Sequence, residues 1–249
     1  MALQSVSRTV RAFVRSPRTF FEEQPAATSL GAGFVVVLVF AVVLAGSVAF
    51  LGATLAGSVD ETVTVDNPDR PPAWVCDGST PDVGGSSFEE RCEEPETIER
   101  DAGSIVQEAA NDLVPWLFVT PFLFWAIAGT VLFVGARLAG GDGGFLETVA
   151  VAAWGVVPEF LRLAAALVGL RYVLGRTTFT GPVERYPDQL ATAIAPLDVP
   201  LLLVSLVVLG WQWLLLTAGL EETHDLPRPV AGATVGVLLA VWGVFVVLG

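Results

Sequence analysis

The chain has 249 residues, and its 26 acidic and 13 basic side chains give a net charge of −13, yet 53% of its residues are hydrophobic. A mean hydropathy of +0.65 excludes a disordered protein. All 13 basic residues are arginine, which excludes Walker A loops and Schiff-base catalysis, because both need lysine. The only basic cluster is four N-terminal arginines, so we expect no nucleic-acid partner.

Arginine without lysine in an acidic chain is similar to the composition of proteins from salt-loving archaea. We therefore interpret the chain as halophilic, with carboxylates that keep its exposed surface soluble in concentrated salt. A GC-rich codon bias would also favour arginine over lysine, and this alternative stays open.

Residues 1–30 predict a cytoplasmic amphipathic segment, in which an interfacial helix is followed by a turn. The apolar residues on one helical face are Leu3, Val6, Val10, Phe13 and Val14, and the arginines of the other are Arg8, Arg11 and Arg15. Such a helix lies flat at the lipid headgroups, or it packs on the protein's own cytoplasmic loops. Phe20 and Phe21 are expected to anchor the chain where it turns into the bilayer.

Five segments are apolar and long enough to cross the bilayer, which takes about 20 helical residues. They are residues 31–57, 114–136, 146–170, 199–220 and 229–249. The predicted fold class is all-α, a polytopic membrane protein with a bundle of five transmembrane helices and the N-terminal interfacial helix. We therefore expect the protein to be embedded in the lipid bilayer, which is the first of its expected partners.

The arginines predict the orientation in the membrane. Arg8, Arg11, Arg15 and Arg18 precede the first span. Positive charge favours the cytoplasmic side, so we expect a multi-pass protein of the cell membrane with a cytoplasmic N-terminus and an extracellular C-terminus. Three arginines oppose this orientation, because the predicted outer segment 171–198 contains Arg171, Arg176 and Arg185.

The acidic extracellular loop, residues 58–113, separates the first two spans. It contains 15 acidic residues and 3 arginines, a net charge of −12, so the rest of the chain is nearly neutral. Its many Gly, Pro, Ser and Asp residues predict a mostly irregular segment. The carboxylates either bind cations weakly or form a solvated acidic face.

Cys76 and Cys92 are the only cysteines, and both lie in this loop. Outside the cell we expect them to form a disulfide. Free thiols and a metal site with Asp77, Glu93 or Glu94 are the alternatives. Since the spacing matches no familiar zinc pattern and no histidine lies nearby, we expect no metal.

Span three contains charges near the centre of the membrane. Glu159 and Arg162 are three residues apart, so they share a helical face and can pair, and Pro158 favours a kink or a broken helix. Gln212 is the one strongly polar side chain of span four. Such groups are either a structural ion pair inside the bundle or, as in many transporters, a ligand or ion path.

Two stripes of small residues repeat every four positions and predict close helix packing, within the chain or between copies. They comprise Ala45, Ala49, Ala53 and Gly57 in span one, and Gly232, Gly236 and Ala240 in span five. No catalytic constellation is found, and no cofactor is expected. The only histidine, His224, is assigned to a solvated turn beside Glu221, Glu222 and Asp225.

Three segments together resemble the Yip1 family of five-span membrane proteins, in its prokaryotic branch. They are SPRTFFEEQP before span one, GGDGGFLETVAVAAWGVVPEFLRL with its proline, and GLEETHDLPRPVAGATVGV before span five. The resemblance covers most of the chain, excluding the acidic loop, and assigns residues 31–249 to a Yip1-like membrane domain. It rests on Pro17, Phe20, Phe21, Gly140 to Gly144, and Pro158. It implies a five-helix bundle with a cytoplasmic N-terminus, no enzyme activity and no cofactor.

These observations favour a non-enzymatic membrane scaffold or adaptor that binds other membrane proteins, or its own copies, through the small-residue stripes. The alternative is a small transporter or channel component that uses the charges at the centre of span three.

Overall fold

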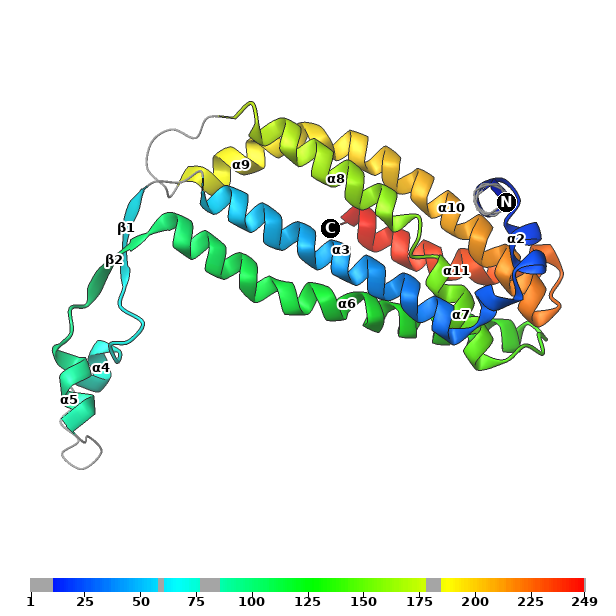
Figure 1. Ribbon diagram of the computed structural model, residues 1–249, viewed down its shortest axis with the longest axis horizontal. Coiled ribbons are helices and arrows are strands. Elements are labelled where there is room, and N and C mark those ends of the chain that lie inside the picture. Colours follow the sequence, from blue (N-terminus) through cyan, green and yellow to red (C-terminus); the bar gives the residue numbers. More distant parts are fainter. Residues whose placement is uncertain (1–10, 58–60, 77–85, 178–184, 249) are drawn as a thin grey trace, which may run out of the picture. The chain divides into compact units, whose positions relative to one another are not determined.

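The computed structural model describes residues 11–57, 61–76, 86–177 and 185–248. Residues 11–15 are helical, and the elements that follow (Figure 1) are α2 (Pro17–Glu23), the 3-10 turn η1 (Pro25–Thr28), α3 (Leu30–Ala56), β1 (Thr62–Asp66), α4 (Ala73–Cys76), α5 (Ser86–Glu93), β2 (Thr97–Asp101), α6 (Ala102–Leu138), α7 (Phe145–Trp154), α8 (Glu159–Leu174), α9 (Tyr186–Ile194), η3 (Ala195–Leu197), α10 (Asp198–His224) and α11 (Arg228–Leu248). The predicted helical membrane protein is confirmed, with one small hairpin in addition.

Four helical segments are long and apolar enough to cross a membrane, counted over the described residues. They are Leu30–Ala56, Ala102–Leu138, Phe145–Leu174 and Asp188–His224. They contain predicted spans two to four, and they match the first predicted span to within one residue at its end. The fifth predicted span corresponds to α11, whose described apolar stretch, Arg228–Val241, is shorter than the other four.

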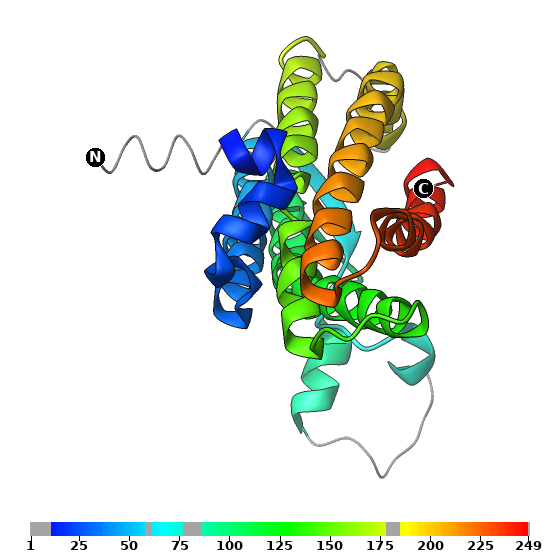
Figure 2. The same ribbon diagram turned by 90° about the vertical axis from the view of Figure 1, so that its right-hand side faces the viewer.

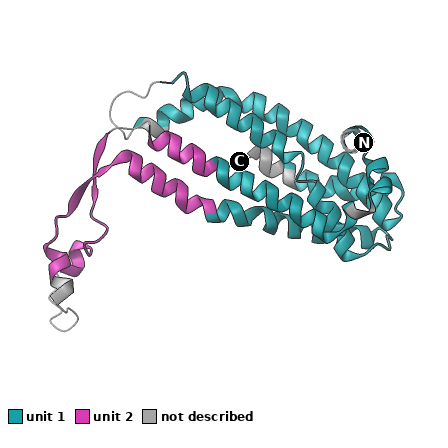
Figure 3. Ribbon diagram, viewed as in Figure 1, with its two compact units in different colours: residues 1–47, 115–249 teal, residues 48–114 magenta. Residues whose placement is uncertain are grey.

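The chain divides into two compact units (Figure 3). Unit 1 comprises Met1–Ser47 and Pro115–Gly249, and unit 2 comprises Val48–Val114. Helices α3 and α6 each contribute to both units, and each unit is described by itself below.

Unit 2 has more regular structure than predicted. The prediction of a mostly irregular loop is wrong for its described residues, because β1 pairs with β2 in an antiparallel hairpin, with Thr62 opposite Asp101 and Asp66 opposite Thr97. The cause is the alternation of Thr and Val in β1, which gives exposed and half-buried positions in turn.

Helix α6 begins at Ala102, twelve residues before the predicted span start at 114. Asp101 caps this early start, since its carboxylate accepts a hydrogen bond of 2.8 Å from the Ser104 backbone N–H. Within unit 2, α6 then runs so close to α3 that a Cβ at Gly52 would overlap the Cβ of Ala110.

In unit 1, the short helix α7 is largely buried. All six residues from Thr148 to Ala153 are buried. Glycines of three other helices touch α7, because a Cβ at Gly33 of α3, Gly129 of α6 or Gly219 of α10 would press on Ala150, Val149 or Val151 respectively. Small residues allow this close approach of helix backbones.

Helix α10 connects four other helices of unit 1, since it contacts α2, α7, α8 and α11. Figure 2 shows α10 between α8 on one side and α11 on the other. The polar side chains of α10 therefore depend on these neighbouring helices for hydrogen-bond partners.

An aromatic cluster fixes the N-terminal segment to the bundle. Phe13, Phe20 and Phe21 are buried, and the ring of Phe13 lies 5.7 Å from Trp154 and 5.8 Å from Trp211. The expectation that Phe20 and Phe21 anchor the chain in the bilayer is wrong, because Trp154 covers Phe20 and protein surrounds both rings.

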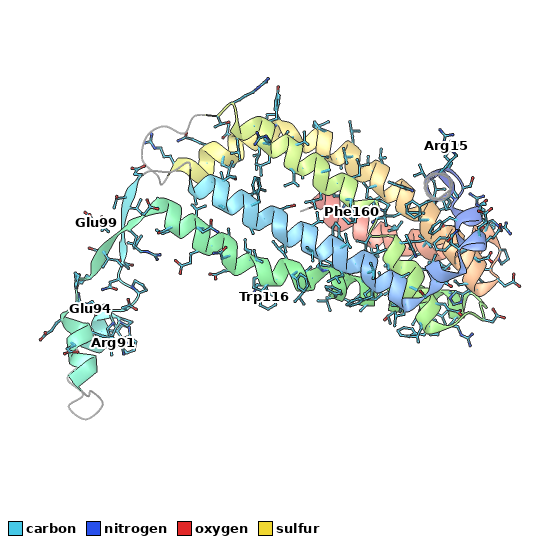
Figure 4. The ribbon with its side chains drawn as sticks, viewed as in Figure 1. Arg15, Arg91, Glu94, Glu99, Trp116 and Phe160 are labelled. Atoms are coloured by element: carbon cyan, nitrogen blue, oxygen red, sulfur yellow. A yellow bond between two sulfur atoms is a disulfide. The ribbon has the colours of Figure 1, made fainter. Side chains whose placement is uncertain are left out.

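Only part of the predicted amphipathic helix lies in the described residues, since Leu3, Val6, Arg8 and Val10 fall outside them. Of the rest, Phe13 faces the bundle, and Arg11 and Arg15 are exposed, as Figure 4 shows for Arg15. Val14, which was assigned to the apolar face, is 51% exposed. The described part thus packs on the protein itself, through a narrower apolar face than predicted.

Candidate functional site

A helix break lies between α7 and α8, where a kink or a broken helix was predicted. Helix α7 ends at Trp154 and α8 begins at Glu159. Across the break the backbone bonds are of the i→i−3 type, and the Glu159 N–H donates to the carbonyl of Val156 at 3.0 Å. Because Pro158 has no N–H to donate and Glu159 donates elsewhere, the carbonyl of Gly155 loses its helical partner.

The side chain of Gln212 supplies the missing partner from α10. Its Nε2 donates a hydrogen bond of 2.8 Å to the Gly155 carbonyl and one of 2.7 Å to Oε1 of Glu159. Gln212 is only 7% exposed, so both bonds are shielded from solvent. One amide therefore holds the turn and the first residue of α8 against α10.

Glu159 and Arg162 form the predicted ion pair. The distance from Arg162 Nη1 to Glu159 Oε2 is 3.0 Å, and the two side chains are 21% and 17% exposed. The next residue of α8 after Glu159, Phe160, packs edge-on against Phe40 of α3 and is labelled in Figure 4. Both carboxylate oxygens of Glu159 are thus engaged within the chain.

Several polar atoms at this site find no partner among the described residues. They are Nε and Nη2 of Arg162 and Oε1 of Gln212, all covered from solvent. Pro158, Glu159, Arg162 and Gln212 were each singled out in the sequence, and the structure brings them together. Only the Glu159–Arg162 contact followed from spacing, because the contact with Gln212 joins residues 53 positions apart.

His224 is buried at the end of α10. The assignment to a solvated turn is wrong, since His224 is the last residue of α10 and is 1% exposed. Its Nε2 lies 2.7 Å from the Thr148 hydroxyl, which donates its one hydrogen to the Gly144 carbonyl at 2.8 Å. The Thr148 hydroxyl therefore links the His224 ring to the Gly144 carbonyl at the start of α7.

The glycine-rich turn between α6 and α7 encloses this histidine. A Cβ at Gly143 would overlap the Thr223 carbonyl oxygen, and one at Gly141 would lie 2.9 Å from the Cβ of His224. Glycine is thus required for the turn to reach the end of α10. Two features of the sequence could have indicated this turn as a candidate site: its run of glycines, and the fact that His224 is the only histidine of the chain.

Tryptophan N–H groups bond to backbone carbonyls of neighbouring elements. Trp125 of α6 donates to Val149 of α7 at 2.6 Å, and Trp213 of α10 donates to Gly232 of α11 at 2.9 Å. The stripe residues Gly232 and Gly236 both lie against Trp213. This part of the predicted stripe in α11 is therefore used within the chain.

Along the other predicted stripe, exposure increases toward the C-terminal end of α3. Ala45, in unit 1, is buried, Ala49 is half-buried, and Ala53 and Gly57 are exposed. Unit 2 also contains the predicted disulfide, between Cys76 of α4 and Cys92 of α5, with 5.7 Å between their Cα atoms. Both cysteines of the chain are thus joined in this bond, as the disulfide alternative predicted.

Comparison with family models matches residues 11–249 to the Yip1 domain. The match includes the helix break, Gln212 and the turn around His224. No curated protein and no solved structure matches the chain.

Proposed function

The chain belongs to the Yip1 domain family, and we propose that it is a non-enzymatic membrane scaffold or adaptor, which holds other membrane proteins through the apolar faces of its helices. A membrane location follows from the family and from the four candidate spans. The proposal goes further, since it assigns these faces to partner proteins as well as to lipid.

The observation that carries the proposal is the contrast between the interior and the outside of unit 1. At the helix break, Gly155 and Glu159 find their partners within the chain. On α3, in contrast, Val35, Val39 and Val42 are 48–55% exposed and lie on one face, at spacings of four and three residues. Such a face meets either lipid tails or the helix of a partner protein.

The proposal includes five spans and an orientation. Helix α11 has 21 residues, about 31 Å of helix, which is enough for the hydrocarbon core. With the N-terminal arginines in the cytoplasm, five spans leave the C-terminus outside. The Cys76–Cys92 disulfide supports this orientation, because it is expected on the oxidising side of the membrane.

Site-specific photo-crosslinking in native membranes tests the scaffold role. A photoreactive amino acid is placed at Val35, Val39 or Val42 in turn, and at Leu203 of α10, which is also exposed, as a comparison face. We expect the three α3 positions to give the same discrete adduct and Leu203 a different pattern. Adducts with lipid alone at every position, together with a monomeric protein in mild detergent, would contradict the proposal.

A small transporter or channel component is the second candidate function, and the helix break beside Glu159 and Arg162 is the observation that favours it. Transporter sites are commonly built at interrupted helices near the membrane centre. A liposome flux assay compares the parent protein with Glu159→Gln and Arg162→Ala variants. Absence of flux in the parent, or equal flux in all three proteins, would remove this candidate.

A further inference from the structure

We propose that Arg162 binds an oxyanion, a carboxylate or phosphate group, through the edge of its guanidinium that carries Nε–H and Nη2–H. The proposal is independent of the scaffold role. It begins from the shape of the guanidinium, a planar fork in which Nε–H and one Nη2–H point the same way, the arrangement that grips two oxygens of an oxyanion at once.

The ion pair with Glu159 leaves this edge free. Arg162 reaches the carboxylate through Nη1, while Nε and Nη2 have no partner among the described residues and are covered from solvent. Unpaired donors of a charged group away from water are costly, and the hydrocarbon region offers no water to satisfy them. An acceptor with two oxygens removes that cost.

Glu159 cannot turn to fill this edge, because Gln212 holds its other oxygen at 2.7 Å. The carboxylate is therefore held from both sides, by Gln212 through Oε1 and by Arg162 Nη1 through Oε2. Arg162 is 21% exposed as a side chain, but Nε and Nη2 themselves are covered, so an anion reaches this edge only when the side chains that cover it move aside.

Charge balance selects among oxyanions. Glu159 already neutralises Arg162, so a bound anion adds negative charge beside a carboxylate. A singly charged carboxylate is therefore favoured over a doubly charged phosphate. The oxyanion is either a small soluble acid or the headgroup of an anionic lipid, and both share the chemistry that the guanidinium edge recognises.

The test measures thermal unfolding of the full chain in neutral detergent, followed by tryptophan fluorescence. Sodium acetate and sodium phosphate are titrated against sodium chloride at equal ionic strength, and a parallel arm titrates phosphatidylglycerol into the micelles. We expect a saturable rise in Tm with acetate if the ligand is a soluble acid, or with phosphatidylglycerol alone if it is a headgroup.

Two variants assign the effect to Arg162. Arg162→Lys keeps the charge and removes the fork, so the apparent affinity should fall about tenfold or more. Arg171→Lys, an exposed arginine of the same helix, should leave it unchanged. No saturable rise with any probe, or an equal rise in Arg162→Lys, would overturn the proposal.

A third variant covers the case in which Arg162→Lys does not fold. Glu159→Gln removes the competing negative charge while keeping the shape of the side chain, so the anion should bind roughly threefold or more tightly. Unchanged or weaker binding in Glu159→Gln would overturn the proposal as well.

Discussion

Gln212 and Gly155 lie 57 positions apart in the chain, yet the side-chain amide of the first donates a 2.8 Å hydrogen bond to the backbone carbonyl of the second. That carbonyl is at the break between α7 and α8, where it has no helical donor. In hydrocarbon an unsatisfied carbonyl costs several kcal/mol. The break is therefore stabilised by a side chain from another helix.

Replacing Gln212 by Leu should destabilise the protein. The variant keeps the approximate volume but removes the donors to Gly155 and Glu159, and we expect the unfolding free energy to fall by about 1–3 kcal/mol. Reversible unfolding in mixed micelles, followed by circular dichroism, measures the loss.

The matched control is Gln107→Leu. Gln107 bonds to Asn111 on the exposed surface of α6, so its loss should change stability by no more than about 0.5 kcal/mol. Equal losses in the two variants would show that the Gln212 bonds do not stabilise the break.

The ion pair should show strong coupling between its two members. Arg162→Ala leaves the Glu159 carboxylate without its cation, and in a half-buried setting we expect a loss of about 3 kcal/mol. Adding Glu159→Gln removes the stranded charge, so the double variant should regain part of the stability. A double-mutant cycle from unfolding titrations measures this coupling.

An exposed pair provides the reference for this cycle. Arg18 and Glu22 are 2.8 Å apart, with side chains 68% and 44% exposed, and such pairs contribute about 0–1 kcal/mol. If the coupling of Glu159 with Arg162 is no larger than that of this pair, the ion pair has no special role in the bundle.

Features encoded within one segment could be predicted from the sequence. Apolar runs of about 20 residues predicted the first four spans, and Pro158 predicted the helix break, because hydropathy and the missing N–H of proline act locally. The pairing of Glu159 with Arg162 followed from helical spacing in the same way.

Features that depend on distant partners could not be predicted. His224 is buried by contacts with Gly143 and Thr148, which come from another part of the chain. Its acidic neighbours in the sequence indicated an exposed position instead. Gln212 stands out in the sequence as a polar side chain in an apolar span, but nothing in the sequence identifies Gly155 as its acceptor. In unit 2, the acidic composition concealed the alternation of β1.

Close packing of α10 on α7 should make Gly219 intolerant of substitution. A Cβ at this position would overlap Cγ1 of Val151, a fully buried side chain with little freedom to move. We expect Gly219→Ala to lower the unfolding free energy by about 1–3 kcal/mol.

Gly210, on the same helix, is the control for this substitution, because a Cβ there would meet nothing within 4 Å. Alanine has the higher helix propensity, so Gly210→Ala should be neutral or stabilise by up to about 1 kcal/mol. Both variants are compared in one thermal unfolding assay, and a loss at Gly210 equal to that at Gly219 would refute the packing explanation.

The turn around His224 should open when Gly143 is replaced by Ala. The new Cβ would overlap the backbone oxygen of Thr223, which cannot move without shifting the end of α10. We expect hydrogen exchange of the amides in residues 139–148 to increase at least severalfold. Gly144→Ala is the control, because its Cβ would make only ordinary contacts, the nearest at 3.4 Å, and unchanged exchange in both variants would contradict this account.

The Cys76–Cys92 disulfide provides a direct test of the proposed orientation. Because these are the only cysteines in the chain, any thiol that appears on reduction comes from this bond. If unit 2 faces the outside, a reductant that cannot cross membranes should free both thiols in intact cells, and a maleimide reagent that is likewise impermeant should then label them. A protein oriented the other way would be labelled only after the cells are lysed. Labelling before any reduction would instead contradict the disulfide itself, so the two outcomes separate the orientation from the covalent structure.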